Sequence, residues 1–211
     1  MTSIGKIPKH WQIKKLSDIF NVYGGTTPST SNVEFWNGVI PWVTPTDITK
    51  IKNNIFLDKT EKRITEKAIK ACSLNILDKG TLLLTSRATI GEVTINKIPV
   101  TINQGMTALI PKKREEIYTM FYAYYLQTLK PYLIQLGSGS TFREISKSSL
   151  KNIIIPVLSF KEQEQISTIF FIIDRRLELL KGKKEKLVRI KKGLMNDLFS
   201  GEKRVKLEIL S

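Results

Sequence analysis

The sequence has few of the residues that build metal or redox sites. Its 211 residues include one cysteine, Cys72, and one histidine, His10. This is too few for a zinc finger, and no internal disulfide can form. A single cysteine suits a reducing compartment, so we expect a cytoplasmic protein in which Cys72 is a small core residue. We predict that the chain itself binds no metal and no cofactor.

Three common catalytic motifs are also missing. There is no Gly-x-x-x-x-Gly-Lys-Ser/Thr phosphate-binding loop. None of the 19 acidic residues is followed two positions later by lysine, the pattern of many metal-dependent nucleases. The Asn/Asp-Pro-Pro-aromatic motif of amino-methyltransferases is absent as well. We therefore predict a binding protein without catalytic residues, and the alternative is a nuclease or methyltransferase with an unusual site.

Long apolar runs are absent too. The longest are short, such as Ile169–Ile173, whereas a membrane-spanning helix needs about 18 or more apolar residues. The first eleven residues, MTSIGKIPKHW, lack the apolar region of a signal peptide. The sequence therefore predicts no membrane association.

Positive charge is abundant: 34 basic and 19 acidic side chains leave a formal net charge of +15. A strongly basic protein usually binds a polyanion, and nucleic acid is the leading candidate. The segment from Arg175 to Lys192 has nine basic residues and only two acidic ones, Glu178 and Glu185. This basic segment is either a solvated helix face or a face that meets phosphates or an acidic partner.

A long helix is predicted near the end of the chain, over residues 163–199. Its apolar residues alternate at spacings of four and three, which is the a/d pattern of a coiled coil. Continuing the pattern places Lys184 and Lys191 on the same seam. About 36 helical residues would span roughly 54 Å. A narrow seam needs a partner helix, although packing on the chain's own core is the alternative. The predicted dimerisation residues are Ile166, Phe170, Ile173, Leu177, Leu180, Leu187, Leu194 and Leu198.

The preceding residues predict an α+β fold, that is, a globular mixed α/β domain followed by a long C-terminal coiled-coil helix. We assign the domain to 1–160, the helix to 161–202 and a tail to 203–211. Strands are expected at 39–43 (broken by Pro41), 81–85, 92–95, 106–110 and 151–156. Helices are expected at 65–71 with Thr65 as cap, at 117–135 with an interruption at Pro131, and for one turn at 146–150.

Polar loops are the candidate DNA-binding elements. They cover residues 26–32, residues 85–89 with 103–104, and residues 138–143, and they offer the donors and acceptors that DNA recognition requires. Arg87 and Arg143 suit guanine, whereas Asn103 and Gln104 suit adenine. The alternative is that these are ordinary loops in which Asn103 and Gln104 hold the backbone in place. The predicted DNA-binding residues are Thr26, Thr27, Ser29, Thr85, Ser86, Arg87, Thr89, Asn103, Gln104, Ser138, Ser140, Thr141, Arg143 and Lys147.

The order of short motifs along the chain resembles the specificity (S) subunit of type I restriction–modification systems. The resemblance spans nearly the whole chain. The motifs are Ile7-Pro8-x-x-Trp11, Gly24-Gly25-x-Thr27-Pro28-Ser29, Phe35-Trp36-Asn37-Gly38 with Ile40-Pro41-Trp42, Asp47, Gly80-Thr81-Leu82-Leu83, Ser86-Arg87-x-Thr89-Ile90-Gly91, Asn103-Gln104, Ile153–Pro156, and Glu162-Gln163 or Glu164-Gln165.

This resemblance implies a target recognition domain followed by a conserved spacer helix. Full subunits of the family carry two such units in tandem, and each domain reads half of a bipartite DNA site. Because this chain has one unit, we expect a half-subunit that forms an antiparallel homodimer on a palindromic site. Its segment Val157–Phe160 departs from the family's proline-rich approach to the helix.

The resemblance also implies partners. They are double-stranded DNA, methyltransferase (modification) subunits that carry out S-adenosylmethionine chemistry, and a restriction subunit. The alternative is a stand-alone basic DNA-binding regulator that dimerises through the coiled coil.

Overall fold

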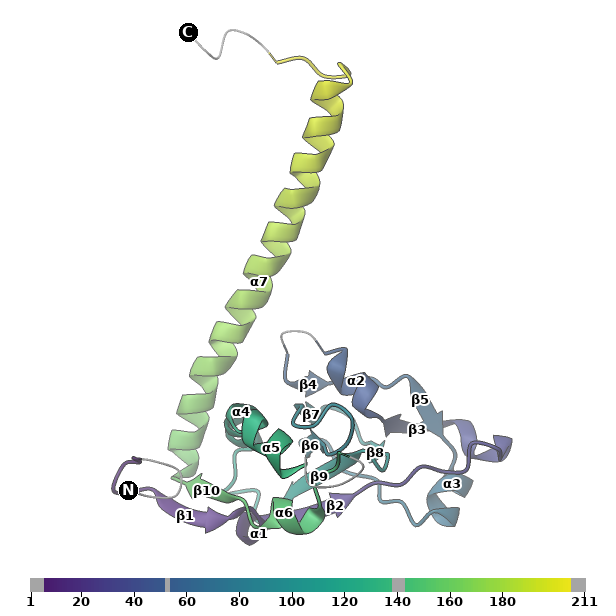
Figure 1. The fold of residues 1–211 in the computed structure, drawn as a ribbon, viewed down its shortest axis with the longest axis vertical. Helices are drawn as coiled ribbons and strands as arrows, with labels where there is room; N and C mark the ends of the chain where they lie inside the picture. Colours follow the sequence, from purple (N-terminus) through teal and green to yellow (C-terminus); the bar gives the residue numbers. More distant parts are fainter. Residues whose placement is uncertain (1–5, 52–53, 138–142, 206–211) are drawn as a thin grey trace. The chain divides into compact units, whose positions relative to one another are not determined.

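The computed structural model describes residues 6–51, 54–137 and 143–205. The chain divides into two compact units, Met1–Phe170 and Phe171–Ser211. The predicted α+β class with a long C-terminal helix is confirmed (Figure 1). In chain order the elements are β1 (Gln12–Lys15), α1 (Leu16–Ile19), β2 (Phe20–Gly24), η1 (Val33–Phe35), β3 (Trp36–Val43), α2 (Pro45–Thr49), β4 (Phe56–Leu57), β5 (Lys62–Ile64), α3 (Glu66–Ala71), β6 (Leu82–Thr85), β7 (Val93–Asn96), β8 (Thr101–Ile102), β9 (Met106–Pro111), α4 (Thr119–Thr128), α5 (Lys130–Leu136), α6 (Lys147–Lys151), β10 (Ile154–Val157) and α7 (Phe160–Phe199).

The centre of the first unit is a five-stranded sheet with strand order β2-β9-β6-β7-β4. Every neighbouring pair is antiparallel except β4 and β7. All four residues of β6 are buried because both faces of the sheet are covered. Leu82 and Leu84 pack into one apolar cluster, and Leu83 points into another. A short run of consecutive apolar residues is typical of a strand buried on both sides.

The aromatic-rich segment forms two helices on one face of this sheet, α4 and α5 (Figure 1). The predicted interruption is present, but it falls at Leu129, so that Pro131 lies in the first turn of α5, where its missing N–H costs nothing. Phe121 and Tyr122 of α4 are buried in the core. Tyr122 meets Phe20 edge to face at 5.3 Å, and its hydroxyl donates to the Pro156 carbonyl at 3.2 Å.

A smaller sheet of order β5-β3-β8 lies beside the central one. Here the predicted break at Pro41 is wrong, because β3 continues through it to Val43. Pro41 follows a bulge, a position where a strand tolerates a missing donor. In this bulge Asn37 has a φ of 60°, and a Cβ on Gly38 would lie 2.3 Å from the Ile64 carbonyl oxygen. The Phe-Trp-Asn-Gly motif therefore has a structural role.

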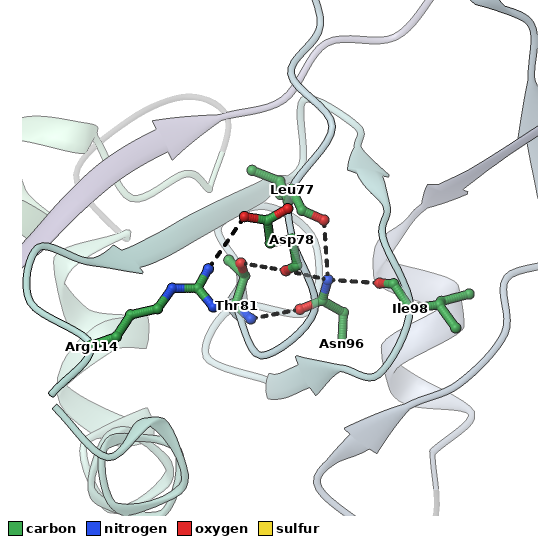
Figure 2. Close-up of polar contacts among 6 residues, drawn as sticks. All are labelled: Leu77, Asp78, Thr81, Asn96, Ile98 and Arg114. Carbon is green, nitrogen blue, oxygen red and sulfur yellow. Dashed lines mark hydrogen bonds and ion pairs between the residues drawn. The ribbon is translucent and has the colours of Figure 1, made fainter.

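One end of the central sheet is closed by buried polar bonds (Figure 2). The Asn96 side chain accepts a bond from the Thr81 amide at 2.8 Å, and it donates to the carbonyls of Asp78 and Ile98 at 2.9 and 2.8 Å. The Thr81 hydroxyl donates to the Asp78 carbonyl at 2.7 Å. These bonds fix the turn at residues 78–80, next to the start of β6 and the end of β7.

The first turns of α7 belong to the first compact unit. The buried Gln163 side chain donates to the carbonyls of Glu116 and Leu158, at 2.9 and 2.8 Å, and accepts from the Tyr118 amide at 2.8 Å. The Trp11 indole donates to Glu162 at 2.9 Å. The helix begins at Phe160, three residues earlier than the apolar pattern predicts, and has 40 residues.

Candidate nucleic-acid interface

Three polar loops leave the central sheet at the end opposite the Asn96 cluster. Strand β2 ends at Gly24, β6 ends at Thr85 and β9 begins at Met106. Gly24 lies opposite Thr107 and Thr85 opposite Met106 in the sheet register. Segments far apart in the sequence, at residues 25–32, 86–92 and 103–105, therefore emerge side by side.

Backbone hydrogen bonds lock these loops together. The Thr26 amide donates to the Ile102 carbonyl at 3.1 Å, and the Ser86 amide donates to the Gly105 carbonyl at 2.8 Å. A Cβ on Gly25 would lie 2.0 Å from the Ile102 carbonyl oxygen. Only glycine permits this close backbone approach, which explains the glycine at position 25.

A fourth segment, at residues 143–147, completes the cluster. The Ile145 amide donates to the Ser86 carbonyl at 3.0 Å, and Arg87 pairs with Glu144 at 2.8 Å. Arg87, Glu144, Arg143 and Ala88 line a hollow of about 410 Å³. Ala88 has a φ of 58°, a costly conformation for a residue other than glycine that is frequent at functional sites.

The predicted DNA-binding residues divide by exposure. Thr85 and Ser86 are buried, and the Thr85 hydroxyl donates to the Thr89 carbonyl and accepts from the Glu92 amide. Asn103 accepts from the Gly105 amide at 2.9 Å, which is the backbone-holding role named as its alternative. The side chains of Thr85 and Asn103 therefore hold the loops in place, and Ser86 is buried with them.

Other predicted side chains are open to solvent at the converging loops. We call these exposed residues the polar loop surface: Thr26, Arg87, Thr89, Gln104, Arg143 and Lys147. Thr27 is half-buried beside them. Lys147 reaches across Gly24, since a Cβ there would lie 2.4 Å from its Cε. The polar loop surface carries three basic groups with amide and hydroxyl groups between them, the composition that phosphates and base edges require.

The remaining predicted residues lie elsewhere. Ser29 is exposed, but its carbonyl accepts from the Trp36 indole at 3.0 Å, next to β3. Ser138, Ser140 and Thr141 lie outside the described residues.

Two acidic residues near this surface have structural partners that the sequence reasoning missed. Glu144 was not a candidate, although it forms the ion pair with Arg87. The buried Asp47 accepts from the Thr44 amide at 2.8 Å and from the Glu61 amide at 2.8 Å. Thr44-Pro45-x-Asp47 is a helix-capping pattern, so the sequence did contain a signal for the role of Asp47.

The seam of α7 is a second candidate surface. Ile166 packs partly against the core of the first unit, in line with the alternative of core packing. The other seven apolar seam residues, from Phe170 to Leu198, are 42–55% exposed. An apolar stripe of this length on an exposed helix marks an interaction surface.

Neither a membrane span nor a metal cluster occurs in the part of the chain that the structure describes. No helix there is long and apolar enough to cross a bilayer. No three His, Cys, Asp or Glu residues there are grouped so as to hold a metal ion.

Comparison with known families identifies the class of protein to which this fold and loop surface belong. The family model described as the type I restriction modification DNA specificity domain matches residues 8–189. The chain therefore belongs to this family, and the family resemblance is confirmed.

Similar proteins of known class support this family assignment. The chain is 45% identical over 198 residues to the type I restriction enzyme MjaIX specificity subunit of Methanocaldococcus jannaschii, covering 94% of this chain and 46% of that protein. It is 30% identical to the Escherichia coli EcoR124I/EcoR124II specificity subunit, covering 74% and 39%. The chain thus spans less than half the length of these relatives.

Solved structures share the fold. The HsdS subunit from Thermoanaerobacter tengcongensis matches with a TM-score of 0.65 at 24% identity, covering 92% of this chain and 45% of that one. The type I restriction–modification S subunit from M. genitalium matches with a TM-score of 0.57 at 20% identity, covering 95% and 49%.

Proposed function

We propose that this chain is a non-catalytic DNA-recognition subunit of a type I restriction–modification system. The observation that carries the proposal is the convergence of Arg87, Arg143, Lys147 and Gln104 at one end of a rigid sheet. The side chains of Thr85, which is buried, and Asn103, which is half-buried, hold these loops in place, which lowers the entropy lost when the surface engages DNA. Base edges are read by the exposed amide and guanidinium groups, and phosphates by the lysine.

DNA selection tests this assignment directly. The purified protein selects a binding sequence from random duplexes, and the Arg143→Ala variant loses about tenfold or more in affinity for it. Arg114→Ala is the matched control, because Arg114 is exposed at the opposite end of the sheet beside Asp78. Equal losses in both variants would mean that general charge, and not the polar loop surface, attracts DNA.

The proposed assembly is a homodimer paired through α7, in which two domains read an inverted, interrupted site. Its support is the exposed apolar seam, which has no second heptad segment in this sequence to pair with. Leu180→Asp or Leu187→Asp would place a charge on the seam and yield monomers with weakened DNA binding. Leu179→Asp is the matched control, since Leu179 is 70% exposed but lies off the seam. Dimers that survive both seam changes would exclude this pairing.

Methyltransferase subunits are the proposed protein partners, since the chain's relatives are specificity subunits of type I restriction enzymes. Co-purification with a modification subunit distinguishes this function from that of a stand-alone basic regulator. A chain that binds its DNA site yet forms no complex with a methyltransferase would favour the regulator.

A further inference from the structure

An apolar hollow lies at the root of α7 within the first compact unit. It has a volume of about 450 Å³, and its walls include Trp11, Tyr124, Tyr125, Ile166 and Phe170. Tyr124 and Phe170 contact each other with ring centroids 5.4 Å apart. A cavity of about 150 Å³ is large enough for benzene, so this apolar hollow has room for two apolar side chains. The surface that its walls expose is almost entirely apolar, which makes phosphates and charged ligands poor occupants.

Two residues of the hollow are also seam residues. Ile166 and Phe170 begin the heptad pattern that ends at Leu194 and Leu198. In an antiparallel coiled coil the a position of one helix packs against the d position of the other. The complete seam overlaps only when Ile166 faces Leu198 of a second copy, and Phe170 then faces Leu194. In this register, the C-terminal end of the second copy's α7 therefore lies next to the apolar hollow.

The end of α7 has the chemistry to fill it. Phe199 is the last residue of the helix and is 83% exposed, and Leu198 beside it is 42% exposed. Phe199 cannot reach the hollow of its own chain, since 33 helical residues separate it from Ile166 by about 50 Å. In a two-fold pair of molecules, the exposed phenylalanine at the end of one helix would meet the apolar hollow at the start of the other.

We propose that the apolar hollow receives Leu198 and Phe199 from α7 of a second copy of this chain. The inference rests on the homodimer proposed above and adds a second contact to it, between helix end and domain. Two-fold symmetry repeats the contact at both ends of the helix pair. Each domain is then held by its own helix and by the partner's helix, which fixes the separation of the two DNA-binding surfaces.

Disulfide trapping tests this contact. In a Cys72→Ser background, Gln127→Cys at the hollow's edge is combined with Phe199→Cys. We expect covalent dimers under mild oxidation. Gln127→Cys with Leu179→Cys is the negative control, because Leu179 lies off the seam and in the middle of the helix.

A second pair separates the two proposals. Leu177→Cys with Leu187→Cys traps the antiparallel register alone, since these positions face each other in it and lie about 15 Å apart within one helix. Trapping of this pair without the Gln127–Phe199 pair overturns the hollow contact and leaves the dimer intact. Failure of both pairs overturns the homodimer as well.

Sedimentation provides an independent measurement without cysteines. Phe199→Asp weakens dimerisation by about tenfold or more, because a charge replaces a buried ring. Val205→Asp is the control, since Val205 is exposed beyond the end of the helix. Equal dimer affinity of Phe199→Asp and the parent protein would refute the contact.

Discussion

Single polar side chains hold both ends of the central sheet through bonds to the backbone. At the end shown in Figure 2, the amide group of Asn96 bonds to backbone groups on both sides of the turn that opens β6. At the other end, Thr85 and Asn103 bond the backbone of the loops that present Arg87 and Gln104. Buried polar groups of this kind are costly to leave unpaired, so each one specifies a local backbone path.

Asn96→Ala is predicted to lower the free energy of unfolding by about 1–3 kcal/mol, because the Thr81 amide and the Ile98 carbonyl lose their partner inside the protein. Urea unfolding followed by circular dichroism measures the loss. Asn75→Ala, at an exposed position, is expected to change stability by less than about 0.5 kcal/mol. A comparable loss in both variants would contradict the role of Asn96.

The buried hydroxyl of Tyr122 is expected to make the protein less stable as the pH rises into the alkaline range. Burial raises the pKa of its hydroxyl above the ordinary value, so the folded state favours the protonated form. This contribution is complete below pH 10, near the unfolded pKa, and is lost as the pH rises further, because the unfolded chain then releases the proton. Tyr122→Phe should therefore lose less stability than the parent protein between pH 9 and pH 11. Parallel urea midpoints for the two proteins over this range would refute it.

Residue identity alone did not distinguish the exposed side chains of the loops from those that hold the loops in place. Arg87 and Thr85 are both polar loop residues in the sequence, but only Arg87 is exposed. Strand register decides this, since Thr85 still pairs with Met106 as the last residue of β6. Glu144 escaped prediction because its partner, Arg87, is distant in sequence. Side-chain roles of this kind depend on which loops converge.

At the scale of elements, local patterns predicted the structure where they are strong. The all-apolar run of β6, the Thr65 cap of α3 and the heptads of α7 each correspond to an observed element. Strand β3 differs, because the bulge that accommodates Pro41 arises from pairing with β5. Short elements such as β4 and β5 have no periodicity of their own, and their pairing defines them.

The proposed pairing of two α7 helices implies an unusual salt response. Lys183 and Lys184 adjoin Gly182 at the centre of the seam, so in this pair they would approach their counterparts where the helices cross. Salt screens this repulsion, with a Debye length of about 10 Å at 0.1 M. Dimer affinity should therefore rise between 0.05 and 0.5 M salt, whereas DNA affinity should fall, because counterions released into a more concentrated salt solution gain less entropy.

Replacing the lysines by neutral residues tests whether repulsion at the helix crossing causes the salt response of the dimer. Lys183→Gln with Lys184→Gln should tighten the dimer at low salt and reduce its salt dependence, as measured by sedimentation equilibrium. Lys192→Gln is the control at a basic position off the seam. A parent dimer that weakens steadily with salt would instead indicate that ion pairs hold it together.

At the scale of the whole molecule, the length of α7 would set the distance between the two DNA half-sites in the proposed dimer. Two recognition domains at opposite ends of an antiparallel pair are separated by the helices between them. A DNA turn covers 34–36 Å, about 10–10.5 base pairs, so each half-site must have both the right distance and the right rotation. The fold class and the long helix could be predicted from the sequence, but the DNA target depends on side chains placed by converging loops.

Lengthening α7 by one heptad tests this coupling. A duplicate of Ile173–Leu179 preserves the seam and adds about 10.5 Å to each helix, which is about three base pairs at 3.4 Å each. Selection from a library of half-sites with variable spacing should then return spacers about three base pairs longer. Affinity should be lower than for the parent, because three base pairs rotate one half-site by about a third of a turn.

The same heptad inserted after Gly201, beyond the end of α7, is the control and should leave the preferred spacing unchanged. An unaltered spacing in both insertions would mean that α7 does not set the distance between half-sites. A longer spacing with the internal insertion alone requires that the two copies remain paired along the lengthened seam while both domains contact DNA. That result would join the polar loop surface and the helix seam in one DNA-bound dimer.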